Sequence, residues 1–534
     1  MRPKTQQVRG RLVPQRAAQS GIVLPFALFV TVLILILGVA FLQTSATESL
    51  TFTRNVQRLQ ANAAAEYGIA CAQAMCMSTG NMHGLWYTMT YNGTPLTTSP
   101  GWTTSAGNSI YGGYEICNLF TNQTVPANSA ATYSVVIQEL SDLGILCSNY
   151  RIHSFGTVGN YTRHVSVDCQ ALNFGSFAWL TNSETDSAGS KVYWATNEAI
   201  GGWNNSALIW SNGQFNIDGS PAFYGPVYSG ASSLNEMNGS NPSFLTNYPV
   251  FSAPDLPLSS VMSNNDITAI KNGVANGGGV SVAANTNDPT PLPTNDPSNP
   301  SNKSTYGYNL VFNGSSYTIY TLTKTGNRIL SPAPQTGTIP SAGMAFYFND
   351  QVLVSGTITG QVTIGTSAGN DIQIVGNLEY SYPAPSSYST TLFSSSYSYD
   401  PLTDTNFTSN CALISGGDIV VEPTTWNATT GAVSAPAWSD VGSDMYITAV
   451  MAAIGNGSST TPGQFWNYFW KSGTPQATLN VFGGICQEER GPVGQVGTTG
   501  FIKNYVFDPR NSTQPPPFLQ NMTIGAMFSN WQLY

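Results

Sequence analysis

Charged residues are scarce in this sequence. They make up 8% of the 534 residues, against about 25% in an ordinary soluble domain. Lysine and arginine together number 18 against 27 acids, which gives a formal net charge of −9. A surface that binds nucleic acid needs a basic footprint for the phosphates. The balance therefore argues against nucleic-acid contact.

Histidine is nearly absent, which limits metal and acid–base chemistry. The three histidines are His83, His153 and His164. Together with Cys147 and Cys169, the last two form a donor set that suits zinc. Strand alternation places Cys169 and His164 on opposite faces, however, so core thiols beside surface imidazoles are the expected arrangement. We expect no metal site and no cofactor.

Signatures of catalysis are lacking as well. No G-x-S-x-G elbow occurs. The acid pairs that could serve glycoside hydrolysis are close neighbours in sequence, where turn or surface positions explain them equally well: Glu184 with Asp186, Asp400 with Asp404, and Glu488 with Glu489. Loop aspartates (Asp288, Asp296, Asp400 and Asp404) offer oxygen ligands for calcium, but no EF-hand loop surrounds them. We expect a protein that is not an enzyme.

Cysteine is infrequent and odd in number. The seven cysteines lie at 71, 76, 117, 147, 169, 411 and 486. An exported chain can oxidise its thiols, but seven leave at least one outside any internal pairing, and the sequence does not give the connectivity.

The longest apolar run is residues 22–42, IVLPFALFVTVLILILGVAFL, twenty-one residues without a charge. A helix of about 20 such residues crosses the hydrocarbon core. The preceding residues 1–21 hold five of the 18 cations and no acid, which favours retention of the N-terminus in the cytoplasm. Residues 22–534 keep 13 cations and 27 acids, a charge of −14.

The helix is expected to continue past the membrane to residue 77. A helix from Ile22 to Met75 would be roughly 80 Å long, so about half of it must pack on its own domain or on neighbours. Pro25 falls in the first turn, where a missing N–H costs least. One helix face is predicted to collect the apolar residues that recur at steps of three and four: Phe52, Val56, Leu59, Ala63, Tyr67, Ala70 and Ala74.

Residues 78–172 are expected to form a head with a small antiparallel sheet. The strand patterns are 132–140, 149–156 and 162–172. In the last of these, Val165, Val167 and Cys169 share one face, and His164, Ser166 and Asp168 share the other.

From residue 173 the sequence pattern changes to very short apolar strands separated by glycine and proline. Three-residue strand cores at 352–354, 362–364 and 372–374 are spaced ten residues apart. Such spacing is typical of a solenoid or a sandwich, and the shortness of the strands favours a β-helix. We expect β-rich regions at 173–423, with a Pro/Asn loop near 286–304, and at 424–534, where 444–454 is predicted to be a strand.

Several motifs resemble known proteins. The segment QSG-IVLPFALFVTVLILILGVAFL with AAAEYGIA resembles the N-terminus of type IV pilins, most closely PilX-like minor pilins. The stretches YRIHSFGTVGNYTRHVSVD, SNGQFNIDGSPAFYGPVYSG, DMYITAVMAAIG, LNVFGGICQEERGPVGQ and GFIKNYVFDPR resemble the head and the uncharacterised β-rich extension of large members of that family.

This resemblance implies processing and partners. A prepilin peptidase would cut between Gly21 and Ile22, the new N-terminus would commonly be methylated, and Ile22, Leu24, Pro25, Phe26 and Leu42 would belong to the membrane and filament helix. Phe26 departs from the pattern, because major pilins carry Glu at this fifth mature position. The departure puts a role as the bulk subunit in doubt. A secretory signal peptide and a plain single-pass anchor are the alternative interpretations.

The expected function is that of a structural minor pilin that displays a large β-rich body for filament assembly or surface adhesion. Its partners would be other pilins, the prepilin peptidase and the inner membrane, and its final place the pilus or cell surface. The alternative is a stationary membrane-anchored envelope protein that binds a glycan or protein ligand. Aromatic residues pack structurally in many β-solenoids; should a ligand surface exist, the candidates are Trp203, Trp210, Tyr224 and Tyr228.

Overall fold

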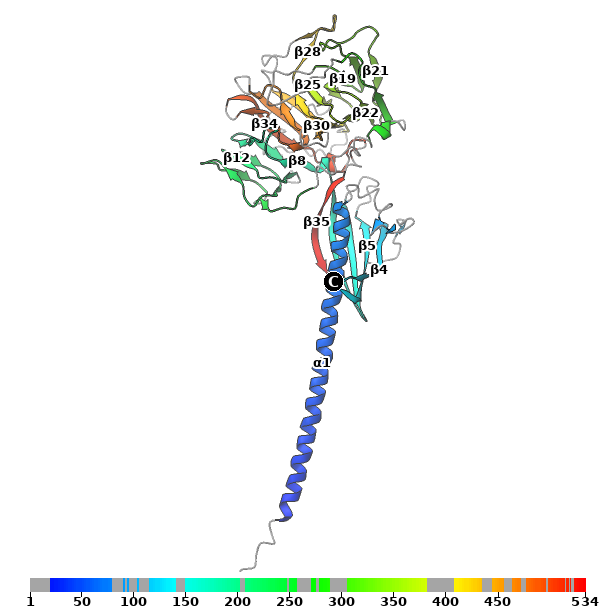
Figure 1. Ribbon diagram of the computed structural model, residues 1–534, viewed down its shortest axis with the longest axis vertical. Helices are drawn as coiled ribbons and strands as arrows, with labels where there is room; N and C mark the ends of the chain where they lie inside the picture. The colour runs from blue at the N-terminus through cyan, green and yellow to red at the C-terminus, as the bar shows by residue number, and fades with distance from the viewer. Residues whose placement is uncertain are drawn as a thin grey trace, which may run out of the picture.

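The computed structural model shows a long helix, a small sheet packed near its far end, and a larger β-rich body beyond that sheet (Figure 1). The prediction of one long N-terminal helix followed by a β-rich region is therefore confirmed. The described residues are 20–78, 90–91, 94–95, 103–104, 115–140, 149–201, 207–246, 249–256, 270–274, 278–288, 305–381, 408–434, 444–455, 463–471, 477–495, 498–513, 515–517, 519 and 523–534. The leader at 1–19 and most of the Pro/Asn loop lie outside them.

Helix α1 spans Ser20–Ser78, 59 residues without interruption. Pro25 is the sixth residue of the helix and not in its first turn as predicted, because α1 begins at Ser20 and not at Ile22. Gly38 is accommodated without close contact, since a Cβ there would meet nothing within 4 Å. Five threonine hydroxyls along the helix each donate a hydrogen bond to the backbone carbonyl four residues earlier, so these polar groups are satisfied within the helix. They belong to Thr31, Thr44, Thr47, Thr51 and Thr53.

The head sheet has the strand order β3-β4-β5-β6-β7-β35 among the described residues, and its pairings are antiparallel. Strands were predicted at 132–140, 149–156 and 162–172, and β5, β6 and β7 confirm them. The bounds are β3 Thr103–Thr104, β4 Glu115–Val125, β5 Asn128–Glu139, β6 Asn149–Val158, β7 Tyr161–Asn173 and β35 Thr523–Leu533.

The last strand differs from the expected division of the chain. Residues 424–534 were predicted to continue the β-rich body, but β35 pairs with β7 from Thr523 opposite Asn173 to Leu533 opposite Val165. The C-terminal strand therefore completes the head sheet. The body is an insertion between two neighbouring head strands.

The body is organised around one stack of parallel strands. The order along the stack is β17-β14-β11-β8-β32-β30-β26-β24-β22-β18, and each neighbouring pair is parallel. The chain starts the body at β8 in the middle, proceeds to β17 at one end, resumes at β18 at the other end, and returns to β32 beside β8. The first and last parts of the body are thus neighbours, which brings β7 and β35 together. The bounds are β8 Phe177–Ser183, β11 Leu208–Ser211, β14 Val227–Ser229, β17 Val250–Phe251, β18 Gly279–Val282, β22 Met344–Phe348, β24 Gln361–Thr366, β26 Asn410–Ser415, β30 Met445–Ala453 and β32 Ala477–Glu489.

Further strands pair beside this stack. β34 lies in parallel between β32 and β10, and β23 lies in parallel between β19 and β25. Strands were predicted at 352–354, 362–364, 372–374 and 444–454, and β23, β24, β25 and β30 confirm them. The remaining bounds are β1 Thr90–Tyr91, β2 Thr94–Pro95, β9 Trp194–Ala195, β10 Ala199–Gly201, β12 Asn216–Asp218, β13 Ala222–Phe223, β15 Asn235–Glu236, β16 Ser243–Phe244, β19 Tyr308–Gly314, β20 Ser316–Thr321, β21 Gln335–Thr338, β23 Val352–Ile358, β25 Ile372–Tyr380, β27 Ile419–Val421, β28 Thr425–Trp426, β29 Val433–Ser434, β31 Phe465–Asn467, β33 Gly494–Gln495, β34 Thr499–Phe507, with the short helices η2 Phe174–Ser176 and α5 Arg510–Thr513.

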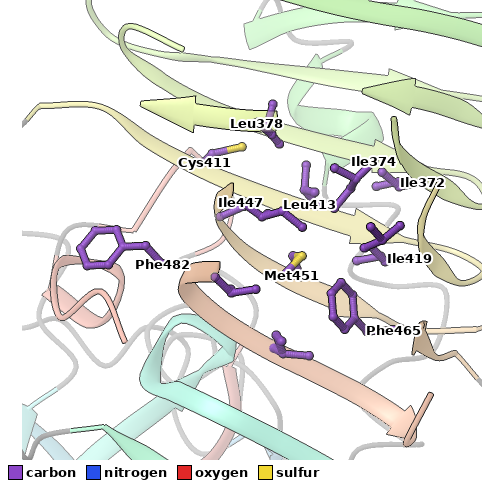
Figure 2. Close-up of a cluster of buried hydrophobic side chains, with 14 of the residues drawn as sticks. Ile372, Ile374, Leu378, Cys411, Leu413, Ile419, Ile447, Met451, Phe465 and Phe482 are labelled. Carbon is purple, nitrogen blue, oxygen red and sulfur yellow. The ribbon is translucent and has the colours of Figure 1, made fainter. Parts of the chain in front are cut away.

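The central strands of the stack are mostly apolar, without regular polar alternation, because both of their faces are buried. In β30, Ile447, Ala449 and Met451 point into the large interior cluster. Val450 and Ala452 point into a second cluster on the opposite face. Figure 2 shows how Ile447 and Met451 lie beside Leu413 and Ile374 from neighbouring strands in the interior cluster. This explains why 444–454 has no polar alternation.

Candidate functional site

The first half of α1 is the largest exposed apolar surface among the described residues. Leu24 is 77% exposed, Phe26 66% and Leu42 68%. Among the described helices, α1 is the one long and apolar enough to cross a membrane, and its most apolar window has a mean hydropathy of 2.8 with none of it buried. Gly21, Ile22 and Pro25 lie in its first two turns.

The exposed part of α1 is longer than a membrane requires. From Ser20 to Ala61, the first fully buried residue, the helix runs about 60 Å at 1.5 Å per residue. The hydrocarbon core of a bilayer is about 30 Å thick. Roughly half of the exposed helix therefore extends beyond any membrane that the apolar run occupies.

Small residues seat the second half of α1 on the head sheet. The buried residues of this contact include Ala61, Ala65 and Ile69. A Cβ on Gly156 of β6 would lie 2.1 Å from the Ala61 carbonyl oxygen and 2.3 Å from the Ala65 nitrogen. A Cβ on Gly68 of α1 would lie 2.2 Å from the Ser154 hydroxyl oxygen. The helix backbone thus rests directly on β6, an approach that needs glycine on both sides.

The helix face that packs on the head is not the face on which the recurring larger apolar residues lie. Phe52 and Leu59 are 70% and 71% exposed. Ala63, Ala70 and Ala74 are exposed, and Val56 and Tyr67 are half-buried. The close approach of helix and sheet selects alanine and glycine for the contact, and it leaves much of the apolar face identified from the sequence outside it. Phe52 and Leu59 therefore keep most of their surface exposed, whereas Tyr67 packs on Tyr133 of the head at 5.4 Å between ring centroids.

The outer face of the head sheet buries a histidine pair. His153 Nδ1 lies 2.9 Å from His164 Nε2, and His153 Nε2 lies 2.8 Å from the Gln138 side-chain oxygen. Burial, together with the neighbouring His164 and Arg151, lowers the pKa of His153 to about 3. His153 is 3% exposed, so the expectation of surface imidazoles is wrong for this residue.

The predicted alternation on β7 is confirmed. Val165, Val167 and Cys169 belong to the core cluster under α1, while His164 stacks on the outer face with Phe155 and with Tyr534. Cys169 and the histidine pair therefore lie on opposite sides of the sheet, and Cys147 lies outside the described residues. Within the described parts of the chain, no group of three or more His, Cys, Asp or Glu side chains is placed to hold a metal ion.

The four aromatic candidates do not form one surface in the described structure. Trp203 lies outside the described residues. Trp210 is 5% exposed, stacks on Tyr228 at 4.7 Å between ring centroids, and donates to the Asn212 side chain at 3.1 Å. Tyr224 and Tyr228 are half-buried. Trp210 therefore packs structurally and does not offer a ring face to a ligand.

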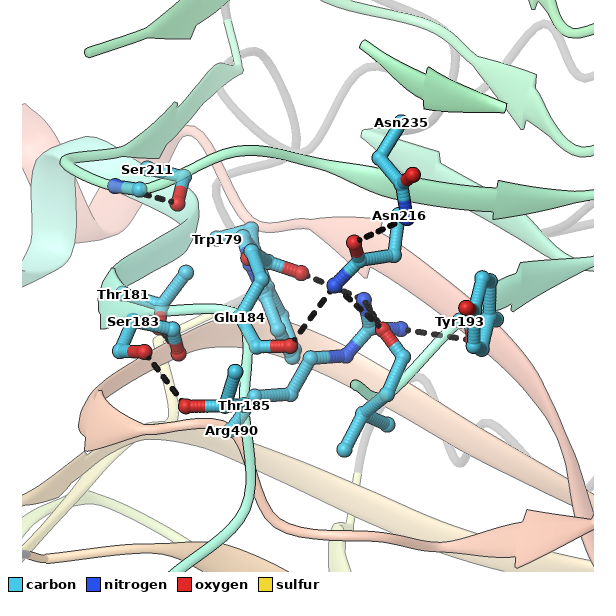
Figure 3. A network of polar contacts seen from close by, with 12 residues as sticks. Trp179, Thr181, Ser183, Glu184, Thr185, Tyr193, Ser211, Asn216, Asn235 and Arg490 are labelled. Atoms are coloured by element: carbon cyan, nitrogen blue, oxygen red, sulfur yellow. Dashed lines mark hydrogen bonds and ion pairs between the residues drawn. The ribbon is translucent and has the colours of Figure 1, made fainter. Parts of the chain in front are cut away.

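A buried charge cluster joins the ends of β8, the first strand of the body, and of β32, a late strand beside it (Figure 3). Arg490, which follows β32, donates to Glu184, which follows β8, at 2.5 Å. Its guanidinium lies 4.2 Å from the Trp194 ring centroid and 5.3 Å from that of Trp179. Trp179 in turn donates to Glu184 at 3.0 Å. The Arg490 and Glu184 side chains are 0% and 1% exposed, so the pair is sealed from any substrate.

A second buried pair extends this cluster. Lys503 of β34 pairs with Glu198, and it also donates to the Tyr193 carbonyl at 3.2 Å. Burial lowers the pKa of Lys503, and the Glu198 carboxylate opposes that shift. Sequence reasoning missed both pairs. The available signal was the presence of single cations, Arg490 and Lys503, beside apolar strands in a chain with so few charges.

Among the described residues, three acids of the pairs considered from the sequence accept hydrogen bonds within the body: Glu184, Asp186 and Glu489. Glu184 belongs to the buried ion pair, and Asp186 accepts backbone hydrogen bonds from Ala188 and Ser190 in its own turn. Burial raises the pKa of Glu489, whose carboxylate accepts a hydrogen bond from the Gln464 amide at 3.3 Å. Asp400 and Asp404 lie outside the described residues.

Comparisons with known proteins give little identity. No protein-family profile matches the chain, and no curated protein matches it. Among solved structures, the chain is similar to the competence-associated pilin ComZ from Thermus thermophilus, at 12% sequence identity and a TM-score of 0.30, with 90% of this chain and 97% of the other covered.

Proposed function

We propose that this chain is a pilin-type structural subunit of a type IV pilus or a related filament, most similar to PilX-like minor pilins. The observation that carries the proposal is the exposed half of α1. It is apolar enough to be held in a membrane, twice as long as a membrane needs, and attached by its other half to a small sheet. Other helices of the same kind would cover it outside the lipid.

Processing is part of this proposal. The five cations of the leader and Gly21 precede the apolar run directly. Cleavage after Gly21 by a prepilin peptidase would remove those charges and leave Ile22 as the N-terminus, commonly methylated. The helix could then leave the bilayer without dragging a charged segment through the hydrocarbon, which is costly.

Assembly would bury the apolar residues that the head leaves uncovered. Phe52 and Leu59 are 70% and 71% exposed, and burying a side chain of this size stabilises a contact by about 1.5–3 kcal/mol. Phe26 supplies no carboxylate to pair with a neighbour's terminal amine. This favours a minor position in the filament over that of the bulk subunit.

The body is proposed to be a β-helix displayed outside the cell for filament assembly or surface adhesion. Its parallel stack, with apolar side chains inside and turns between short strands, supports the β-helix interpretation. The buried charge cluster supports a structural role for its acids, since Glu184 has no solvent access. No enzymatic activity is proposed.

Two measurements test the proposal: the sequence of the mature N-terminus and the presence of the protein in surface filaments. We expect N-terminal sequencing of the protein from its native cells to begin at Ile22, and sheared, purified surface filaments to contain it. Gly21→Val should block cleavage and leave the longer form in the inner membrane. Gly38→Ala is the matched control, because a Cβ there meets nothing within 4 Å, and it should be processed normally.

Two results would overturn the proposal. One is a mature protein that retains Met1, which would indicate the stationary membrane-anchored alternative. The other is normal processing with no protein in purified filaments or on the cell surface.

A further inference from the structure

A cavity of about 290 Å³ lies beside β18, the strand at one end of the parallel stack. Its walls come from β18, from the β19–β20–β21 sheet, and from residues 329–335. β19, β21 and β22 lie at the end of the body that is far from α1 (Figure 1). The volume is at the small end of the range for ligand pockets, which is about 300–1,000 Å³. It suits one small molecule and not a folded partner.

The apolar floor of this cavity continues the interior of the body. Val282 and Ile319 belong to the large buried cluster. Ile329 is fixed beside them because its backbone N–H donates to the Thr321 carbonyl at 2.9 Å. The floor therefore presents a preformed hydrocarbon surface.

The rim supplies uncharged hydrogen-bonding groups around one aromatic ring. Tyr308 pairs directly across the strands with Thr321, and Gln335 lies opposite Ile319. Asn287 completes the polar rim. Asn287 and Gln335 are exposed, so their side-chain amides are open to solvent and to a ligand.

No charged side chain is present among the described residues that line the cavity. The nearest cation in sequence, Arg328, is held elsewhere: its guanidinium lies 4.5 Å from the Tyr320 ring centroid and 4.4 Å from that of Trp426, and it donates to Asn309 at 2.8 Å. A charged ligand would therefore lose its hydration without gaining an ionic partner.

The Tyr308 ring is held in place before any ligand arrives. Its hydroxyl donates to the Ala283 carbonyl at 2.9 Å, and its ring lies 5.8 Å from that of Phe348. Burial raises the pKa of Tyr308, and the carboxylates of Asp350 and Asp288 add to this. The residue therefore stays neutral, and its ring position costs no ordering upon binding.

We propose that this cavity binds a single neutral sugar residue, a hexose or an N-acetylhexosamine. A pyranose ring has one face of C–H groups, which fits the floor and the Tyr308 ring, and an edge of hydroxyls, which fits Thr321, Asn287 and Gln335. The same combination of apolar walls and few convergent polar groups is what small-molecule sites generally show. This inference is independent of the proposed filament role. It would hold even if the protein bound a sugar and never entered a filament.

The test is titration calorimetry on the full chain in lauryldimethylamine oxide micelles, which carry no sugar headgroup. The probes are glucose, galactose, mannose and N-acetylglucosamine, with glucuronate as the charged counterpart. We expect at least one neutral sugar to bind at millimolar concentration, and glucuronate to bind at least tenfold more weakly. The proposal would be overturned if none of the four neutral sugars binds at about 50 mM. It would also be overturned if glucuronate binds as tightly as the best neutral sugar.

Two variants place the binding in this cavity. Ala333→Trp fills the space from an exposed position and should weaken sugar binding at least tenfold. Thr336→Trp is the matched control, because Thr336 is exposed on the opposite face of β21, and it should bind as the unaltered chain does. The assignment would be overturned if Ala333→Trp still binds the sugar. It would also be overturned if a proline-rich peptide binds and none of the sugars does.

Discussion

Replacement of Arg490 by methionine should be among the most destabilising single changes in the body. Arg490 lies where the returning strand β32 ends, and its partner Glu184 lies just after the first strand β8. Its side chain is 0% exposed and donates to Glu184 at 2.5 Å, to the Val192 carbonyl at 3.0 Å and to the Tyr193 carbonyl at 3.1 Å. The guanidinium also lies over the Trp194 ring. Methionine can fill the space and can replace none of these bonds.

The magnitude follows from the charge that is left behind. After Arg490→Met, the Glu184 carboxylate stays buried with the Trp179 N–H as its remaining side-chain donor. Breaking a buried pair by removing one partner costs about 3–5 kcal/mol. The Tyr193 carbonyl keeps a bond from Lys503, whereas Val192 loses a donor. We therefore expect the free energy of unfolding of the body to fall by about 3–5 kcal/mol.

A double variant separates the cost of the orphaned charge from the value of the pair. Glu184→Gln with Arg490→Met removes both charges and keeps an amide oxygen to accept from Trp179. Neutral replacement of a buried ion pair is often close to neutral in stability. The double variant should therefore recover most of the loss, even though it carries one more substitution than the single variant.

The assay is equilibrium urea unfolding of the full chain in detergent, followed by tryptophan fluorescence. The rings of Trp179 and Trp194 lie 5.3 Å and 4.2 Å from the guanidinium, so the signal reports on this region. A loss below about 1 kcal/mol in Arg490→Met would refute the reasoning. So would a double variant that is as unstable as the single one.

Three further outcomes are expected. The folded head takes up a proton at His153 only near pH 3, whereas the unfolded chain takes it up near pH 6.5, so stability should fall as the pH falls from 6.5 towards 3. His153→Phe should flatten that slope in acid-unfolding curves, and an unchanged slope would contradict it. Gly156→Ala should destabilise the head by about 2 kcal/mol or more, because its Cβ would lie 2.1 Å from a helix carbonyl, while Gly376→Ala, whose Cβ would meet an ordinary 3.5 Å contact, should leave the melting curve unchanged. Cys411 and Cys486 are fully buried, and burial raises their pKa, so mass spectrometry after maleimide treatment of the native protein should find both unlabelled; labelling without denaturant would count against this packing.

The local sequence pattern was enough to predict the long helix and several strands. It was not enough to predict which strands pair with each other. The apolar run, three of the head strands (β5, β6 and β7) and the strand at 444–454 follow from residue type and period alone. The pairing of β35 with β7 joins Thr523 to Asn173 across the whole body, and no local signal in the last eleven residues distinguishes a head strand from a body strand. The buried face of α1 was missed for a related reason. Its small residues are required because α1 lies very close to β6. That distance cannot be read from the sequence of the helix alone.

The sequence does not show which aromatic residues the fold buries. Trp210 was a candidate for a ligand surface, yet the stack buries it against Tyr228. The cavity beside Tyr308 carries no sequence motif, because its walls come from segments that meet at the end of the stack. A site assembled from Val282, Ile319 and Gln335 depends on pairing register, and register is set by tertiary packing.

The arrangement of the body explains how so large an insertion is compatible with a small head. The chain leaves the head at β7 and must return beside it at β35, so the first strand of the body and its late strands have to be neighbours. They are: β32 pairs with β8 in register from Ile485 opposite Trp179. The return path is also held at the head, where the Cys486 thiol donates to the Phe174 carbonyl at 3.5 Å. Two adjacent connections restrict rotation more than one would, so the head, and through it α1, sets the direction in which the body is carried.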